Sequence, residues 1–181
     1  FDFHIPMMSL PGIFATDLDT IPDDIPYLSV AGELRDAWSE RIGGKGRFRI
    51  GVVWKGSDQH QRNTWRSPGL AALQPLLKAQ DVLWVSLQKD DEASDLRIEQ
   101  MTSTLLALGG RLRDFSDTAA AMTHLDLIIS PDTAVAHLAG ALGRPVWLML
   151  PHVAEWRWLM TRDDSPWYPT MRLYRQHIRG D

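Results

Sequence analysis

The fold of this chain is decided by one stretch, which reads LDLIIS over residues 125–130 and PDTAVAHLA over residues 131–139. The first part is a nearly continuous apolar run, which is typical of a buried β-strand. The second part opens with Asp132 and Thr133, residue types favoured at a helix N-cap, and continues in good helix formers up to Gly143. We therefore predict a strand over 125–130 that leads directly into a helix over 132–142.

The start of such a helix is suited to binding an anion. Its first backbone N–H groups have no partner within the helix, and they lie at the positive end of the helix dipole. The small side chains of Ala134 and Ala136 allow a ligand to approach the backbone closely. An ordinary Asp-capped helix of an α/β domain would show the same sequence pattern, so both interpretations stay open on this stretch alone.

Strand patterns alternate with helix patterns along most of the chain. Strands are predicted over 48–54, 82–87, 111–115, 125–130, 145–150 and 171–174, and helices over 31–41, 68–78, 92–108, 118–124 and 132–142. Apolar strands that alternate with helices indicate a parallel sheet covered on both faces. We predict an α/β, Rossmann-like doubly wound, mainly parallel sheet with strand order 3-2-1-4-5, which binds ligands at the carboxyl ends of its strands.

Composition limits the classes of function. The 181 residues suffice for one domain, and a net charge of −4 gives no electrostatic argument for a nucleic-acid or anionic-membrane partner. The chain has no Cys, which excludes disulfides and thiolate chemistry and is compatible with the cytoplasmic location that we expect. No apolar run is long enough for a membrane span, and no signal peptide is visible. Residues 1–30 carry no sustained period, and we expect them to lie extended along a domain formed by residues 31–181, in a fragment of a longer protein.

The loops after the strands should share one edge of the sheet. The loop after the first strand, residues 55–66, is polar and contains Lys55, Gly56, Arg62 and Arg66. Either arginine could reach a phosphate held at the helix start, since guanidinium binds phosphate in a bidentate manner. Taken singly, each cation is better explained as a solvated loop charge, and it is the shared edge with the helix start that favours a phosphate site. His137 should point back toward the helix start, where it makes either a polar contact near the ligand or an ordinary core contact.

Several common sites are excluded or disfavoured by their motifs. No GxGxxG follows the first strand, which disfavours a dinucleotide cofactor of the usual kind, and the absence of GxxxxGK[ST] excludes a P-loop. No serine lies in a GxSxG elbow, and the six histidines lack the spacing of metal ligands. We therefore expect neither a metal nor a cofactor.

Several segments together resemble a known family. They are residues 8–11 (MSLP), 51–56 (GVVWKG), 66–67 (RS), 85–88 (VSLQ), 113–119 (RDFSDTA), 130–147 (SPDTAVAHLAGALGRPVW), 155–159 (EWRWL), 164–169 (DSPWYP) and 171–176 (MRLYRQ). This series resembles the C-terminal half of bacterial glycosyltransferases related to the heptosyltransferases, glycosyltransferase family 9. It is most similar to the members that are often fused to tetratricopeptide repeats.

The resemblance implies a GT-B fold, in which two Rossmann-like domains face each other across the active site. Residues 1–30 would then connect the two domains, and residues 31–181 would bind the nucleotide-diphosphosugar donor. The enzyme would be inverting and metal-independent, with its general base in the preceding domain. Ala134 stands where many heptosyltransferases have Gly, and the resemblance does not specify the sugar.

The resemblance also implies roles for individual residues. Asp132, Thr133 and Ala134 would meet the diphosphate with His137 behind them, Arg66 would supply a cation, Gln88 and Lys89 would lie near the ribose, and the base would rest near residues 113–115. The predicted binding set is therefore Lys55, Gly56, Arg62, Arg66, Gln88, Lys89, Asp114, Phe115, Asp132, Thr133, Ala134 and His137. The alternative is a non-catalytic scaffold or protein-interaction module that has kept the glycosyltransferase fold, and binding of a donor analogue would separate the two.

Overall fold

The computed structural model describes residues 2–57, 59, 63–89 and 105–179, which contain a six-stranded sheet of order β3-β2-β1-β4-β5-β6. All neighbouring strands of this sheet are parallel. The strands are β1 (Phe48–Val52), β2 (Val82–Ser86), β3 (Leu105–Ala107), β4 (Leu127–Pro131), β5 (Val146–Leu150) and β6 (Met171–Arg175). The predicted Rossmann-like fold class is confirmed, and β6 extends the predicted strand order by one at the edge.

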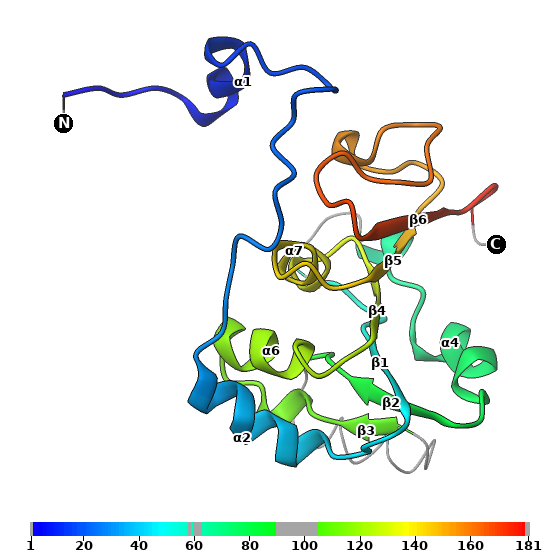
Figure 1. Ribbon diagram of the computed structural model, residues 1–181. Helices are drawn as coiled ribbons and strands as arrows, with labels where there is room; N and C mark the ends of the chain where they lie inside the picture. The colour runs from blue at the N-terminus through cyan, green and yellow to red at the C-terminus, as the bar shows by residue number, and fades with distance from the viewer. Residues whose placement is uncertain (1, 58, 60–62, 90–104, 180–181) are drawn as a thin grey trace.

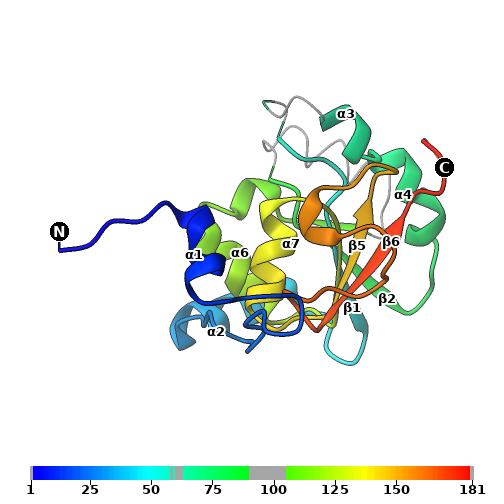
Figure 2. The ribbon, with the colours of Figure 1, turned by 90° about the horizontal axis from the view of Figure 1, so that it is seen from above.

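Helices cover both faces of the sheet (Figures 1 and 2). The α-helices are α1 (Leu10–Ile13), α2 (Gly32–Ile42), α3 (Asn63–Arg66), α4 (Leu70–Leu77), α6 (Phe115–Met122) and α7 (Ala134–Ala141), and the 3-10 helices are η1 (Met7–Ser9), η2 (Gly109–Arg111) and η3 (Trp156–Trp158). Helices α2, α6 and α7 lie on one face, and α4 lies on the other.

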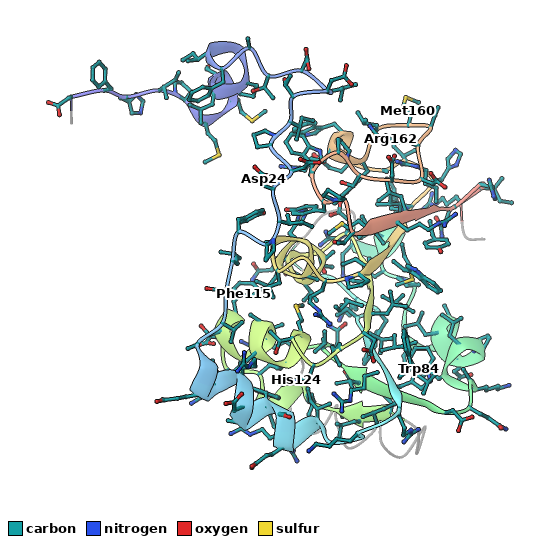
Figure 3. All side chains as sticks on the ribbon, viewed as in Figure 1. Asp24, Trp84, Phe115, His124, Met160 and Arg162 are labelled. Carbon is teal, nitrogen blue, oxygen red and sulfur yellow. The ribbon has the colours of Figure 1, made fainter. Side chains whose placement is uncertain are left out.

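Each face has its own hydrophobic core. On the face that α2, α6 and α7 cover, Trp38 of α2 and Met122 of α6 are fully buried together with Ile128 of β4. On the other face, Leu73 and Leu77 of α4 pack with Trp84 of β2, which Figure 3 labels beside α4. All five residues of β4 are buried, which explains why its sequence is mostly apolar.

Two predicted elements between β2 and β4 are wrong. Residues 92–104 of the predicted helix lie outside the described part, but Leu105–Ala107 form strand β3, paired with β2. A short apolar run suits a helix or a buried strand equally, and pairing with β2 decides between them here. Residues 111–115, predicted as a strand, instead end η2 and begin α6.

Helix α6 begins at Phe115, three residues before the predicted start, because Asp114 is its N-cap. The Asp114 carboxylate accepts hydrogen bonds from the backbone N–H groups of Ser116 and Asp117, at 2.8 and 3.0 Å. The other predicted elements exist, with ends shifted by a few residues.

The N-terminal segment differs from the extended strap that we expected. It contains the short helices η1 and α1, and residues 2–20 stand away from the domain (Figure 1). Only its later part reaches α7, where the N–H groups of Tyr27 and Leu28 both donate to the carbonyl of Ala141, at 3.0 and 3.2 Å. Residues 27–28 therefore tie this segment to the C-terminal end of α7.

Candidate functional site

Most of the predicted binding residues line one cavity of about 780 Å³ at the carboxyl edge of the sheet. Its walls come from the loops after β1 and β2, the start of α6 and the start of α7. Strands β1 and β4 are neighbours in space although β2 and β3 separate them in sequence, so the cavity opens at the topological switch point. The predicted residues that line it are Lys55, Gly56, Arg66, Gln88, Lys89, Asp114, Phe115, Thr133 and Ala134.

Arg66 links the two sides of the switch point. Its Nη1 atom donates to the main-chain carbonyl of Asp132 at 2.6 Å, so a residue of the loop after β1 holds the turn after β4. Gly56 makes room for this side chain, because a Cβ atom there would lie 2.6 Å from Nη2 of Arg66. The Nε atom of Arg66 is buried and lacks a hydrogen-bond partner among the described residues. The predicted convergence of Arg66 and the Asp132 turn is therefore present in the structure.

Among the described residues, the start of α7 has no capping bond from its N-cap side chain. Thr133 occupies the N-cap position with extended backbone, but its hydroxyl lies 3.1 Å from the hydroxyl of Ser130 and makes no capping bond in the described chain. Thr133, Ala134 and Val135 all line the cavity. The uncapped backbone N–H groups of this eight-residue helix therefore lie beside the cavity into which Arg66 reaches.

Asp132 faces away from the capping position that we predicted for it. Its Oδ1 atom lies 3.5 Å from Nε2 of His137, one turn further along α7. Burial raises the pKa of Asp132, but the neighbouring side chains of His137 and Trp158 and the charge of Arg66 outweigh this effect, so the net pKa is below its usual value. Asp132 is thus an ionised carboxylate that lies against His137 and does not cap α7.

His137 points back toward the helix start, as predicted, and it has a second partner. Its Nδ1 atom lies 3.2 Å from the hydroxyl of Tyr168, and its ring stacks on the buried Trp158 at 5.3 Å between centroids. Both aromatic residues belong to the segment between β5 and β6. Sequence reasoning did not assign them to the site, because no local pattern connects residues 21 and 31 positions beyond His137 to the turn that they support.

Three of the predicted contact residues have polar atoms already engaged by the protein. The Oε1 atom of buried Gln88 accepts from the backbone N–H groups of Trp54 and Lys55, at 3.3 and 3.0 Å. Lys89 donates from Nζ to the carbonyl of Arg113 at 2.9 Å. Asp114 likewise binds backbone N–H groups at the start of α6. All three side chains therefore fix the backbone that forms the cavity wall.

Arg113 and Asp117 form an ion pair beside the cavity that the sequence analysis did not select. Asp117 is buried and accepts from Nε of Arg113 at 2.8 Å and from the indole N–H of Trp38 at 3.1 Å. The hydrogen bond from Arg113 lowers the pKa of Asp117 to about 2; burial opposes the shift, and the bond from Trp38 adds to it. Arg113 precedes the N-cap of α6, so the helical i,i+4 rule does not apply to this pair, and the sequence carried no clear signal for it.

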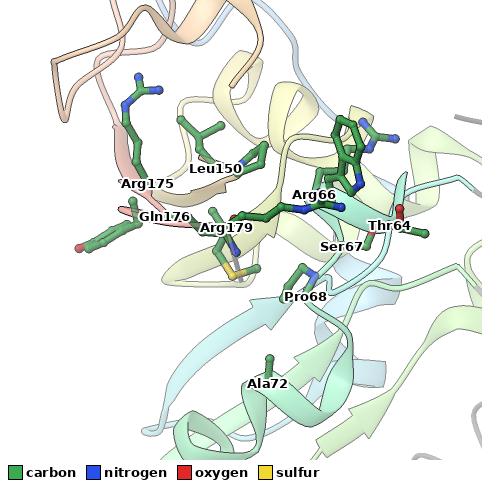
Figure 4. A pocket seen from close by; sticks show the side chains of 13 residues that line it. Thr64, Arg66, Ser67, Pro68, Ala72, Leu150, Arg175, Gln176 and Arg179 are labelled. Atoms are coloured by element: carbon green, nitrogen blue, oxygen red, sulfur yellow. The ribbon is translucent and has the colours of Figure 1, made fainter. Parts of the chain in front are cut away.

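A second cavity of about 520 Å³ also has Arg66 in its lining (Figure 4). Residues of the loop after β1 form one wall, and residues at the ends of β5 and β6 form another. Arg179 lies over the ring of Trp65 here, 4.7 Å from its centroid. Arg66 lines both cavities, whereas Arg62, also predicted to bind, lies outside the described residues.

The described ranges contain no group of three or more His, Cys, Asp or Glu residues that could hold a metal ion. Within the same ranges, no helix combines the length and the apolar character needed to cross a membrane.

Part of this chain is similar in sequence to one protein family and to a bacterial protein. Residues 22–147 match the model of glycosyltransferase family 9 (heptosyltransferase). Protein FlbA of Caulobacter vibrioides is 29% identical over 130 residues, which cover 70% of this chain and 22% of FlbA.

Two solved structures share the fold at low sequence identity. The E. coli ADP-heptose LPS heptosyltransferase II has a TM-score of 0.60 at 16% identity, over 90% of this chain and 49% of that protein. A family 9 glycosyltransferase of Veillonella parvula has a TM-score of 0.61 at 15% identity, over 82% of this chain and 42% of that protein. The chain thus spans less than half of each of these longer proteins.

Proposed function

The chain belongs to glycosyltransferase family 9, and on this premise we propose that it is the donor-binding half of an inverting, metal-independent glycosyltransferase of GT-B fold. The bound donor would be a nucleotide-diphosphosugar in the cavity at the switch point. The observation that carries the proposal is the convergence of two sources of positive potential, Arg66 and the uncapped start of α7, on that cavity.

This arrangement suits a leaving diphosphate. In the proposed reaction, a hydroxyl oxygen of the acceptor bonds to the anomeric carbon while the bond from that carbon to the diphosphate oxygen breaks. The acceptor proton passes to a general base in another domain. Negative charge grows on the departing diphosphate, and the N–H groups at residues 134–135 together with Arg66 would stabilise it without a metal.

The rest of the cavity fits the nucleoside. The exposed ring of Phe115 and the backbone of Arg113, whose carbonyl is held by Lys89, also line this cavity. We propose that the base rests against this backbone and that the ribose lies near Lys89. Because one similar structure is an ADP-heptose heptosyltransferase, ADP is the first nucleotide to test.

We also propose that the chain is the C-terminal half of its GT-B pair. The support is that it spans 49% and 42% of the two similar structures, and that residues 2–20 carry exposed apolar side chains such as Phe3, Met7 and Phe14. These side chains would pack against a preceding domain, and we propose that tetratricopeptide repeats precede that domain in the same protein. A scaffold that has kept the fold is the alternative function.

Isothermal titration calorimetry of the 181-residue chain with ADP, UDP, GDP and CDP tests the proposal, with the corresponding nucleosides as controls. We expect one nucleoside diphosphate to bind best, and its nucleoside to bind more weakly because it lacks the charge that Arg66 and α7 attract. Equal binding of nucleoside and diphosphate would contradict the diphosphate site. Absence of binding by all four diphosphates at millimolar concentration would favour the scaffold.

A further inference from the structure

A row of four side chains connects the phosphate-facing turn to the N-terminal segment. It runs from Asp132 to His137 at 3.5 Å, from His137 to Tyr168 at 3.2 Å, and from Tyr168 to Tyr27 at 3.4 Å. The donor site as described uses only the first two of these residues. We propose that Tyr168 is a positioning residue that fixes the tautomer of His137, and that Tyr27 couples the turn to the N-terminal segment through it.

The proton positions along this row follow from the chemistry of its ends. An ionised carboxylate only accepts hydrogen bonds, so the Nε2 atom of His137 that faces Asp132 must carry a proton. Nδ1 of a neutral imidazole is then an acceptor, which requires the hydroxyl of Tyr168 to donate to it. The oxygen of Tyr168 remains able to accept, and the hydroxyl of Tyr27 donates to it. In all three links, the donor lies on the Tyr27 side and the acceptor lies on the Asp132 side.

Packing leaves the Tyr168 ring little freedom to leave this row. Gly140 lies three residues after His137 on α7, and a Cβ atom there would come within 2.5 Å of the Tyr168 ring. The ring therefore lies directly against the helix on the face that carries His137. On the other side of His137, the stacked and buried Trp158 limits rotation of the imidazole.

The N-terminal segment meets the C-terminal end of α7 directly and is linked to His137 of α7 through Tyr168. Backbone N–H groups of Tyr27 and Leu28 bind the carbonyl of Ala141 at the C-terminal end, and the Tyr27 side chain reaches the row that leads to Asp132 at the N-terminal end. A displacement of residues 27–28 would therefore break the link at Tyr168 or move α7. This inference rests on the proposed function. If a preceding domain moves, residues 27–28 move with it, and the turn at Asp132 would then hold a diphosphate differently.

Long-range ¹H–¹⁵N NMR of the histidine side chains tests the tautomer directly, without any ligand. In the wild-type chain, we expect His137 to be protonated at Nε2 alone. Tyr168→Phe removes the hydroxyl and keeps the ring, and it should produce a mixture of His137 tautomers. Tyr174→Phe is the matched control, since Tyr174 lies on β6 beside Trp147 and outside the row. An unchanged His137 spectrum in Tyr168→Phe would overturn the proposal.

Calorimetry on the same variants tests the consequence for binding. Loss of one hydrogen bond should weaken nucleoside diphosphate binding by about three- to tenfold in Tyr168→Phe, and by a smaller factor in Tyr27→Phe. Tyr27→Phe should also increase the rate of amide hydrogen exchange at residues 27–28. A changed tautomer with unchanged diphosphate affinity would overturn the link to the site. If the wild-type chain binds no diphosphate, the proposed function fails, while the NMR result still decides the role of Tyr168.

Discussion

The guanidinium of Arg66 donates to the main-chain carbonyl of Asp132 across a distance of 2.6 Å, which joins the loop after the first strand to the turn after the fourth. This contact leaves the second Nη group close to Gly56, at the wall of the cavity. One arginine therefore has two tasks, to hold the turn and to add positive charge beside the start of α7.

Replacement of this arginine should weaken diphosphate binding specifically. Charge-assisted hydrogen bonds contribute roughly 1.5–3 kcal/mol each, so Arg66→Ala should raise the Kd for the preferred nucleoside diphosphate by about tenfold to a hundredfold. The loss should shrink as the salt concentration rises, because ions screen the charge. Calorimetry at two salt concentrations measures both effects, and binding of the nucleoside alone should hardly change.

Two further variants separate charge from geometry. Arg66→Lys keeps the charge without the planar fork, and we expect an intermediate loss. Arg172→Ala removes an exposed cation of β6 that pairs with Asp163, and it should leave binding unchanged. A similar loss for nucleoside and diphosphate in Arg66→Ala would contradict the role of Arg66 and direct attention to Lys55.

The approach of the Arg66 loop to the Asp132 turn could be predicted because topology brings these two loops together. Alternation of strands and helices predicted a Rossmann-like sheet, in which β1 and β4 are neighbours and their loops share one switch point. The strand at 105–107 was missed because a short apolar run does not distinguish a helix from a strand. Tyr168 and Trp158 were missed for a different reason, since only tertiary packing brings the segment between β5 and β6 to His137.

Gln88 illustrates the limit of assigning side-chain roles from sequence. Its carbonyl oxygen satisfies two backbone N–H groups next to the cavity, so Gln88→Met should leave them unpaired. We expect the free energy of unfolding to fall by about 1–3 kcal/mol, the cost of unsatisfied buried donors. Urea denaturation followed by circular dichroism measures the loss. Gln74→Met, on exposed α4 surface, is the control and should change little.

The isolated chain should bind a donor without transferring its sugar. In the proposed arrangement, the general base and much of the acceptor site belong to the preceding domain, so this half holds the leaving group alone. Incubation of the 181-residue chain with a nucleotide-diphosphosugar and candidate acceptors should yield no glycosylated product by mass spectrometry. Transfer of sugar by this chain alone would show that the division between the two halves is wrong.

Asp117 should make the stability of the domain sensitive to acid. Its folded-state pKa of about 2 lies below its usual value of 3.8, chiefly because Arg113 donates to it. A depressed carboxyl pKa contributes stability above the unfolded-state pKa, and the contribution is lost as the pH falls from about 4 through about 2. At neutral pH, Asp117→Asn should therefore lower the free energy of unfolding by about 2 kcal/mol.

The difference between the wild type and Asp117→Asn should then shrink as the pH approaches 2, because the wild-type carboxyl also becomes neutral. Urea denaturation at pH 7, 5, 4 and 3 follows this convergence. Asp36→Asn is the matched control, since Asp36 lies exposed on α2 beside Arg35, and a surface ion pair of this kind contributes little. A constant difference between wild type and Asp117→Asn down to pH 3 would assign the loss to packing around Trp38, and would contradict a charge-based role for the buried carboxylate.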